Sequence, residues 1–168
     1  QENSWIYLYM TTQDDDMLEN RVVRYTLEED NITEPTTIIS RLPGAPYHDG
    51  GRMEFGPLGR LYITAGDATN SEWAQDTDVL AGKILRVNPD GSVPVENPFN
   101  NSIYSYGHRN PQGLAWISGQ LWATEHGRSG LQSGMDELNR ISSGGNYGWP
   151  VIEGGQTQPG MINPVIHS

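Results

Sequence analysis

The sequence predicts an all-β fold of the β-propeller class, in which small antiparallel sheets pack side by side as blades. Three observations support this prediction. Short aromatic and β-branched runs are separated by turn signals such as Pro89-Asp90-Gly91 and Ser143-Gly144-Gly145. Similar pairs of runs recur along the chain, with Gly59-Arg60-Leu61 and Gly119-Gln120-Leu121 lying 60 residues apart. No long stretch keeps a helical period, and residues 71–80 allow at most a short helical turn.

Each repeat is expected to contain an apolar strand ending in Thr, a polar loop, and a second strand in which Arg precedes an apolar residue. A β-sandwich is the competing fold, since it would also contain short strands, but it does not explain the repeat. The expected first strands are residues 6–11, 61–64 and 121–124, and the expected second strands are residues 21–25, 83–87 and 137–141.

The chain is expected to form a single domain, residues 1–168, built as a partial propeller of about three blades. The approximate blade units are residues 5–45, 46–105 and 106–168. Propellers usually have about four to eight blades, so three blades leave sheet faces and strand edges uncovered. We therefore expect either further C-terminal blades in a longer protein or self-association, for example of two copies about a two-fold axis.

The composition restricts the possible partners. The chain carries 21 acidic and 10 basic residues, a net charge of −11, and Lys83 is its one lysine. Such a charge repels a phosphate backbone, which argues against nucleic acid; it suits calcium binding or a role in solubility alone. Cysteine is absent, so disulfides are excluded, and no apolar run approaches the ~20 residues of a membrane span. No signal peptide is visible, and because the chain begins with Gln we expect processing or truncation.

His48 and Asp67 are the first candidates for chemistry. His48 lies on a glycine-containing loop before a strand-forming segment, and an imidazole can act as a general base near neutral pH. Asp67 follows the first strand of the second repeat, where a carboxylate could orient His48 and favour its protonation. The alternatives are a turn histidine bonded to backbone and an aspartate that caps its own loop.

Residues 107–113, Gly-His-Arg-Asn-Pro-Gln-Gly, place several donors on a backbone that is expected to turn. Arg109 offers a bidentate fork and a permanent charge, and Asn110 offers an amide donor, a pattern suited to an anionic ligand. His108 is expected to bond neighbouring loops in a structural role. Trp149 and Pro150 are expected to cap the core.

Together with Gly-Asn-Tyr-Gly-Trp-Pro at 145–150, the 107–113 segment resembles the soluble PQQ-dependent sugar dehydrogenase family, the glucose and sorbosone dehydrogenases. The resemblance implies a six-bladed propeller of the quinoprotein glucose dehydrogenase type, in a chain about twice as long. It also implies PQQ- and calcium-dependent oxidation of an aldose hydroxyl to a lactone, with a sugar substrate, a separate electron acceptor and an extracellular or periplasmic location.

The resemblance also assigns roles to residues. His48 would take the proton of the anomeric hydroxyl, Asp67 would orient His48, and Arg109 and Asn110 would contact the quinone, with Arg109 stabilising its reduced form. In the family, further Lys and Arg residues from later blades neutralise the carboxylates of the cofactor. This chain alone is therefore expected to bind the quinone poorly.

The resemblance implies two groups of calcium ligands. In the family a Gly-Pro pair offers two backbone carbonyls to the calcium ion that holds the quinone; this chain has Gly127-Arg128, which keeps the carbonyls but adds a cation. Family members with a structural calcium use an acidic pair and a tyrosine, which match Asp136, Glu137 and Tyr147. The alternative for these three is two surface acids and a packed tyrosine.

Two other classes of function stay open. The propeller of hedgehog-interacting proteins keeps this scaffold without serving as a sugar dehydrogenase, so a non-catalytic binding module is possible. A structural module of a surface assembly, with open blade faces paired to other chains, is the third possibility.

Overall fold

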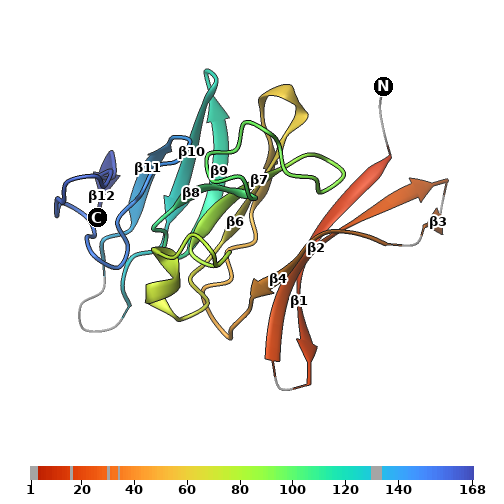
Figure 1. Cartoon of the computed structure of the whole chain (residues 1–168), viewed down its shortest axis with the longest axis horizontal. Coiled ribbons are helices and arrows are strands. Elements are labelled where there is room, and N and C mark those ends of the chain that lie inside the picture. The colour runs from red at the N-terminus through yellow and green to blue at the C-terminus, as the bar shows by residue number, and fades with distance from the viewer. Residues whose placement is uncertain (1–3, 16, 30, 34, 130–133) are drawn as a thin grey trace.

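The computed structural model describes residues 4–15, 17–29, 31–33, 35–129 and 134–168. The described residues form three four-stranded antiparallel sheets and contain no α-helix (Figure 1). The two helical segments are short 3-10 turns, η1 (Pro57–Gly59) and η2 (Ser71–Ala74), and the second confirms the expected turn in 71–80. The first sheet contains β1 (Trp5–Asp14), β2 (Met17–Glu28), β3 (Asn31–Ile32) and β4 (Thr36–Pro43); the second contains β5 (Met53–Phe55), β6 (Leu61–Ala65), β7 (Lys83–Val87) and β8 (Ile103–Tyr106); the third contains β9 (Pro111–Ile117), β10 (Gln120–Glu125), β11 (Glu137–Ile141) and β12 (Ile166–His167).

The strands follow an up-and-down order in the second and third sheets, where each strand pairs with the next in sequence. In the first sheet β2 is central and pairs with β1, β3 and β4. The two expected strands of each repeat pair with each other: β1 with β2, β6 with β7, and β10 with β11.

The second sheet is buried on both faces, because it lies between the other two. Every residue of β6 and β7 is buried. Since side chains alternate along a strand, Ile63 and Leu85 join a core with the first sheet, whereas Tyr62 and Ile84 join a core with the third sheet. This double burial agrees with the apolar residues that both strands present to each side, Leu61 to Ile63 on β6 and Ile84 and Leu85 on β7.

The outer faces of the stack are partly apolar and exposed. On β1 the side chains of Ile6 and Leu8 are 38% and 44% exposed. On the third sheet an apolar depression of about 320 Å³ is lined in part by Leu114, Trp122 and Leu138. These are the faces that the sequence predicted to stay uncovered in a three-bladed unit.

Loops from the second and third sheets meet beside the ends of β6 and β10. The N–H of Asp67 donates to the carbonyl of Arg109 (2.7 Å), and the N–H of Ala68 donates to the carbonyl of His48 (3.1 Å). Gly66 makes this approach possible, because a Cβ there would lie 1.9 Å from the His48 carbonyl oxygen. Backbone bonds therefore hold together three segments that are far apart in the sequence.

Lys83 is wholly buried beneath one of these loops. Its Nζ donates to the carbonyls of Trp73 (2.7 Å), Ala74 (3.1 Å) and Ala81 (2.7 Å), which ties β7 to the turn η2. Burial lowers the pKa of Lys83 to about 7. The lysine thus supports the loop that follows Asp67 and presents no charge to the surface.

Candidate active site

A histidine–carboxylate pair lies open to solvent at the meeting point of the loops. Nδ1 of His48 is 2.8 Å from Oδ1 of Asp67, and the two side chains are 20% and 2% exposed. His48 has a left-handed backbone (φ 64°), which turns the loop before β5. The structure therefore brings together two residues that the sequence proposed separately.

The carboxylate of Asp67 is held at both oxygens. Oδ1 also accepts from the backbone N–H of Thr69 (2.9 Å), and Oδ2 accepts from Nε1 of Trp149 (2.9 Å). An ionised carboxylate can only accept hydrogen bonds, so Nδ1 of His48 carries the shared proton and Nε2 is left as the basic nitrogen. A basic imidazole nitrogen fixed by a buried carboxylate is the arrangement that general-base catalysis needs.

Two arginines lie close to this pair. An Nη of Arg109 donates to the carbonyl of His126 (3.1 Å), and its guanidinium carbon lies 5.5 Å from the centre of the Trp149 ring. Arg128 lies 5.2 Å from the same ring and forms an ion pair with Glu153. Arg109 is 8% exposed, so its charge stays fixed in position rather than free in solvent.

These groups share one cavity. A pocket of about 690 Å³ is lined by His48, Asp67, Arg109, Arg128 and Trp149, together with Thr69, Ser71, Ser129 and Pro150. Trp149 therefore lines this cavity and belongs to neither apolar core, so the expectation that it caps the core is wrong. The cavity combines a base, two cations and an aromatic surface, which suits a planar anionic ligand and a hydroxylated substrate.

Asn110 supports the histidine loop from the third sheet. Its side-chain oxygen accepts from the N–H of Gly50 (3.2 Å), two residues after His48, and the side chain is largely buried. Asn110 also lines a neighbouring cavity of about 680 Å³ that shares His48 and Arg109 with the first. Asn110 thus supports the loop of His48 and lines a cavity together with His48 and Arg109.

A second histidine–carboxylate pair lies inside the protein. Nδ1 of His108 is 2.9 Å from Oε2 of Glu125, and Nε2 is 2.9 Å from Oγ of Ser105. His108 and Ser105 are fully buried, and the imidazole stacks on Tyr147 at 4.8 Å. A Ser–His–Glu chain resembles a hydrolytic triad, but a substrate cannot reach a wholly buried serine. The predicted structural role of His108 is confirmed.

A sequence model of the glucose/sorbosone dehydrogenases matches residues 1–166. The chain belongs to this family. It is 36% identical to the aldose sugar dehydrogenase of Escherichia coli strain K12 and 35% identical to quinoprotein glucose dehydrogenase B of Acinetobacter calcoaceticus. These matches cover 95% and 90% of the chain but only 45% and 38% of the two relatives.

Among solved structures, the PQQ-bound aldose sugar dehydrogenase of Streptomyces coelicolor superposes with a TM-score of 0.89 at 39% identity. The match covers 99% of the chain and 49% of that protein. The predicted fold is confirmed: the three sheets are about three blades of a propeller of the quinoprotein glucose dehydrogenase type. The chain spans about half the length of such a glucose/sorbosone dehydrogenase, and none of its described helices is both long and apolar enough to cross a membrane.

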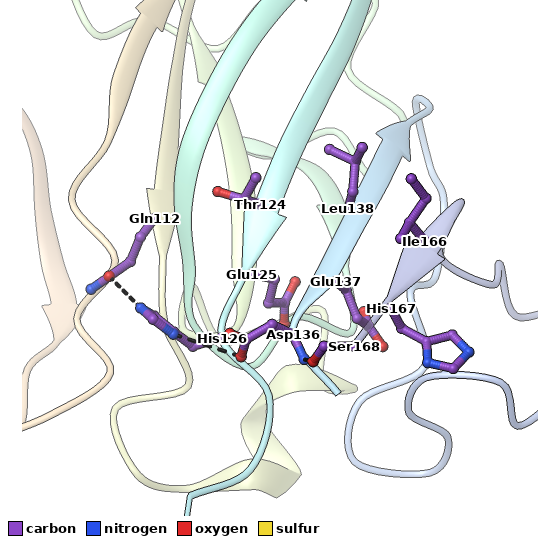
Figure 2. Close-up of a pocket in the computed structure, with 10 residues that line it drawn as sticks. All are labelled: Gln112, Thr124, Glu125, His126, Asp136, Glu137, Leu138, Ile166, His167 and Ser168. Carbon is purple, nitrogen blue, oxygen red and sulfur yellow. Dashed lines mark hydrogen bonds and ion pairs between the residues drawn. The ribbon is translucent and has the colours of Figure 1, made fainter. Parts of the chain in front are cut away.

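Two of the residues proposed to bind calcium, Asp136 and Glu137, line a further pocket of about 500 Å³ (Figure 2). Asp136 is exposed and its Oδ1 accepts from the N–H of Gly127 (2.9 Å). Glu137 accepts from the N–H of Gly154 (2.8 Å), and burial together with the charge of Glu125 raises the pKa of Glu137. The acidic pair is therefore already bonded to backbone donors.

Other groups proposed to bind calcium also have partners within the protein. The hydroxyl of Tyr147 donates to the carbonyl of Arg140 (2.7 Å) and accepts from the N–H of Ser142 (2.8 Å). The carbonyl of Arg128 accepts from the N–H of Gly134 (3.2 Å). Across the described ranges no three His, Asp or Glu side chains are placed to hold a metal ion. Calcium dependence stays a prediction from the resemblance.

The sequence did not predict that Glu125 bonds His108 or that Trp149 bonds Asp67. A signal for Glu125 was present, because it ends β10 just as Asp67 follows the end of β6 in the preceding repeat. No comparable signal marks Trp149, since its partner Asp67 is 82 residues away.

Proposed function

We propose that this chain forms part of a PQQ-dependent sugar dehydrogenase that oxidises an aldose hydroxyl to a lactone. The observation that carries the proposal is the 2.8 Å His48–Asp67 pair, which opens on a pocket that also contains Arg109 and Arg128. Family membership and the PQQ-bound relative support the same chemistry.

His48 acts as the general base. Its Nε2 takes the proton of the anomeric hydroxyl while the hydrogen on the same carbon leaves as hydride, so that the C–O bond becomes a carbonyl. The quinone, when bound, supplies the oxidant that accepts this hydride. Asp67 stabilises the imidazolium that forms, because its buried carboxylate stays 2.8 Å from Nδ1.

The pocket fits the quinone through its charge. Arg109 and Arg128 place two guanidinium groups beside the Trp149 ring, and guanidinium forks bind carboxylates with good geometry. Arg109 also stabilises negative charge that develops on the acceptor. The remaining carboxylates of the cofactor need cations from blades beyond this chain, so the chain by itself binds PQQ weakly.

A non-catalytic binding module is the second candidate. Arg128 favours it, because its guanidinium is already paired with Glu153 and stands where the family has proline. The retained His48–Asp67 pair favours the enzyme, since a scaffold has no need for an exposed histidine backed by a buried carboxylate. The electron acceptor, an extracellular or periplasmic location and self-association stay predictions.

Calorimetric titration with PQQ tests the proposal, on this chain and on a protein extended by the C-terminal blades. Arg109→Ala should weaken binding about tenfold or more, whereas His48→Ala should leave binding within about twofold, because the base contacts the substrate. Arg60→Ala is the matched control, because Arg60 pairs with the exposed Glu96 and lines neither cavity beside His48.

Binding by the extended protein that Arg109→Ala weakens supports the dehydrogenase. Absence of PQQ binding by both proteins contradicts it and favours the binding module. Dye reduction with aldoses then tests the reaction itself. An extended, PQQ-loaded protein that reduces no dye with any aldose would contradict the proposal.

A further inference from the structure

The side chain of Trp149 contacts both Asp67 and the two arginines of the site. Its indole Nε1 donates to Oδ2 of Asp67 (2.9 Å), although the two residues are 82 positions apart and lie on loops of different sheets. We propose that Trp149 is a positioning residue, which fixes the Asp67 carboxylate so that His48 keeps its proton on Nδ1 and presents a basic Nε2. This inference rests on the proposed role of His48 as the base.

The backbone of Trp149 is held from two sides. Its N–H donates to the carbonyl of Gly107 (3.0 Å), and its own carbonyl accepts from the side chain of Gln75 (2.6 Å). Gln75 in turn exchanges two hydrogen bonds with the side chain of Asn146 (3.0 and 2.8 Å). These bonds tie Trp149 to Gln75, in the loop between β6 and β7, and to Gly107, between β8 and β9. They thereby fix the direction of the indole N–H.

Oδ2 of Asp67 depends on the indole N–H, because the other donors to this carboxylate bond Oδ1. Oδ1 bonds both the N–H of Thr69 and Nδ1 of His48, whereas Oδ2 receives the bond from Trp149. The carboxylate is 2% exposed, so water cannot replace a lost donor at little cost. Loss of the indole N–H would therefore leave Oδ2 poorly satisfied and allow the carboxylate to rotate away from His48.

The tryptophan ring also touches the cationic part of the site. The guanidinium carbons of Arg109 and Arg128 lie 5.5 and 5.2 Å from the ring centre, within the range of cation–π attraction. Phenylalanine would keep an aromatic face for the arginines but has no N–H. Trp149→Phe therefore separates the hydrogen bond to Asp67 from the stacking of the arginines.

Nitrogen-15 NMR of the imidazole of His48 in this chain, without ligand, is the direct test. The wild type should show the Nδ1–H tautomer almost alone, and Trp149→Phe should show a mixture of tautomers. Trp116→Phe is the matched control, because the buried Nε1 of Trp116 has no hydrogen-bond partner among the described residues. The control should leave the tautomer unchanged. A pure Nδ1–H tautomer in folded Trp149→Phe would overturn the proposal.

A second variant tests the same hydrogen bond if Trp149→Phe does not fold. Asp67→Asn replaces an anionic acceptor with a neutral amide, so the indole N–H proton signal of Trp149 should move upfield. An unchanged indole signal would also overturn the proposal. Trp116→Phe should not move the Trp149 signal, which separates loss of this bond from general loosening.

The NMR readout is independent of dehydrogenase activity. In an extended PQQ-loaded protein, Trp149→Phe should lower the turnover of aldose about tenfold or more and change KM much less, because one hydrogen bond to a charged group is lost. A tautomer shift without any aldose oxidation by the wild type would retain the positioning role and reject the proposed function. Aldose oxidation with an unchanged tautomer would do the reverse.

Discussion

In the second and third blades a histidine precedes β5 and β9, and a carboxylate lies at or just after the end of β6 and β10. His48 and His108 are 60 positions apart in the sequence, the same spacing as the glycine repeat. The acids Asp67 and Glu125 follow them by 19 and 17 residues, and both pairs are closed by a short contact to Nδ1, 2.8 and 2.9 Å. Two blades of one propeller thus contain the same pair of groups.

The pairs differ in what surrounds them. His48 is 20% exposed and lines a cavity with two arginines, whereas His108 is wholly buried, stacks on Tyr147 and bonds Ser105. Nε2 of His48 can meet a substrate, while Nε2 of His108 is already bonded. Access to Nε2, rather than the histidine–carboxylate pair itself, separates the histidine proposed as a base from the structural one.

Removal of the buried histidine should have the largest effect on stability. His108→Ala removes a buried donor to the Glu125 carboxylate and leaves a cavity beside Tyr147, which together should cost about 3 kcal/mol or more. Urea unfolding should show this loss as a lower midpoint. His48→Ala should cost less, about 1–2 kcal/mol, because the imidazole is partly exposed and Oδ1 of Asp67 keeps the N–H of Thr69 as a donor. Equal losses in the two variants would contradict the comparison.

Removal of the open histidine should have the largest effect on catalysis. In the extended, PQQ-loaded protein, His48→Ala should slow aldose oxidation by roughly 10²–10⁴, the usual contribution of a general base. Ser105→Ala is the control in the buried pair, and its turnover per folded molecule should stay within about twofold. Steady-state dye reduction measures the turnover of both variants. A small effect of His48→Ala would contradict the proposal that only the accessible histidine acts in catalysis.

Tyr147, which packs on the buried pair, should give the smallest effect and a specific pH dependence. Burial raises the pKa of Tyr147 to about 12, from an ordinary value near 10. Between pH 10 and 12 the unfolded chain loses the phenol proton while the folded chain keeps it, so stability falls as pH rises through this range. Tyr147→Phe should cost about 1 kcal/mol at neutral pH, because the hydroxyl no longer donates to Arg140 or accepts from Ser142.

Above pH 10 the stability of Tyr147→Phe should fall less steeply than that of the wild type. Other tyrosines with raised pKa values, Tyr7, Tyr9 and Tyr104, remain in both proteins, so the difference between the two urea midpoints isolates Tyr147. Parallel decline in both proteins would show that Tyr147 does not keep its proton in the folded state.

The fold was largely predictable because its signals are local. Short aromatic and β-branched runs such as 61–64 and 83–87, bounded by turn signals, predict strands whatever their partners. The site was predictable in part. His48, Asp67 and Arg109 stand in recognisable segments, and the structure places them around one cavity. Residue identity alone did not establish the proposed calcium ligands, because Tyr147 and Asp136 form hydrogen bonds with backbone groups in the structure.

The sequence by itself therefore determined the strands, the repeat and the chemical types available for a site, since these depend on neighbours along the chain. Only the tertiary structure decided which histidine is accessible and which is buried, and that Trp149 bonds Asp67. Both depend on how blades and loops pack against one another, and hydrogen bonds between residues 82 positions apart leave no periodic or local pattern in a single sequence.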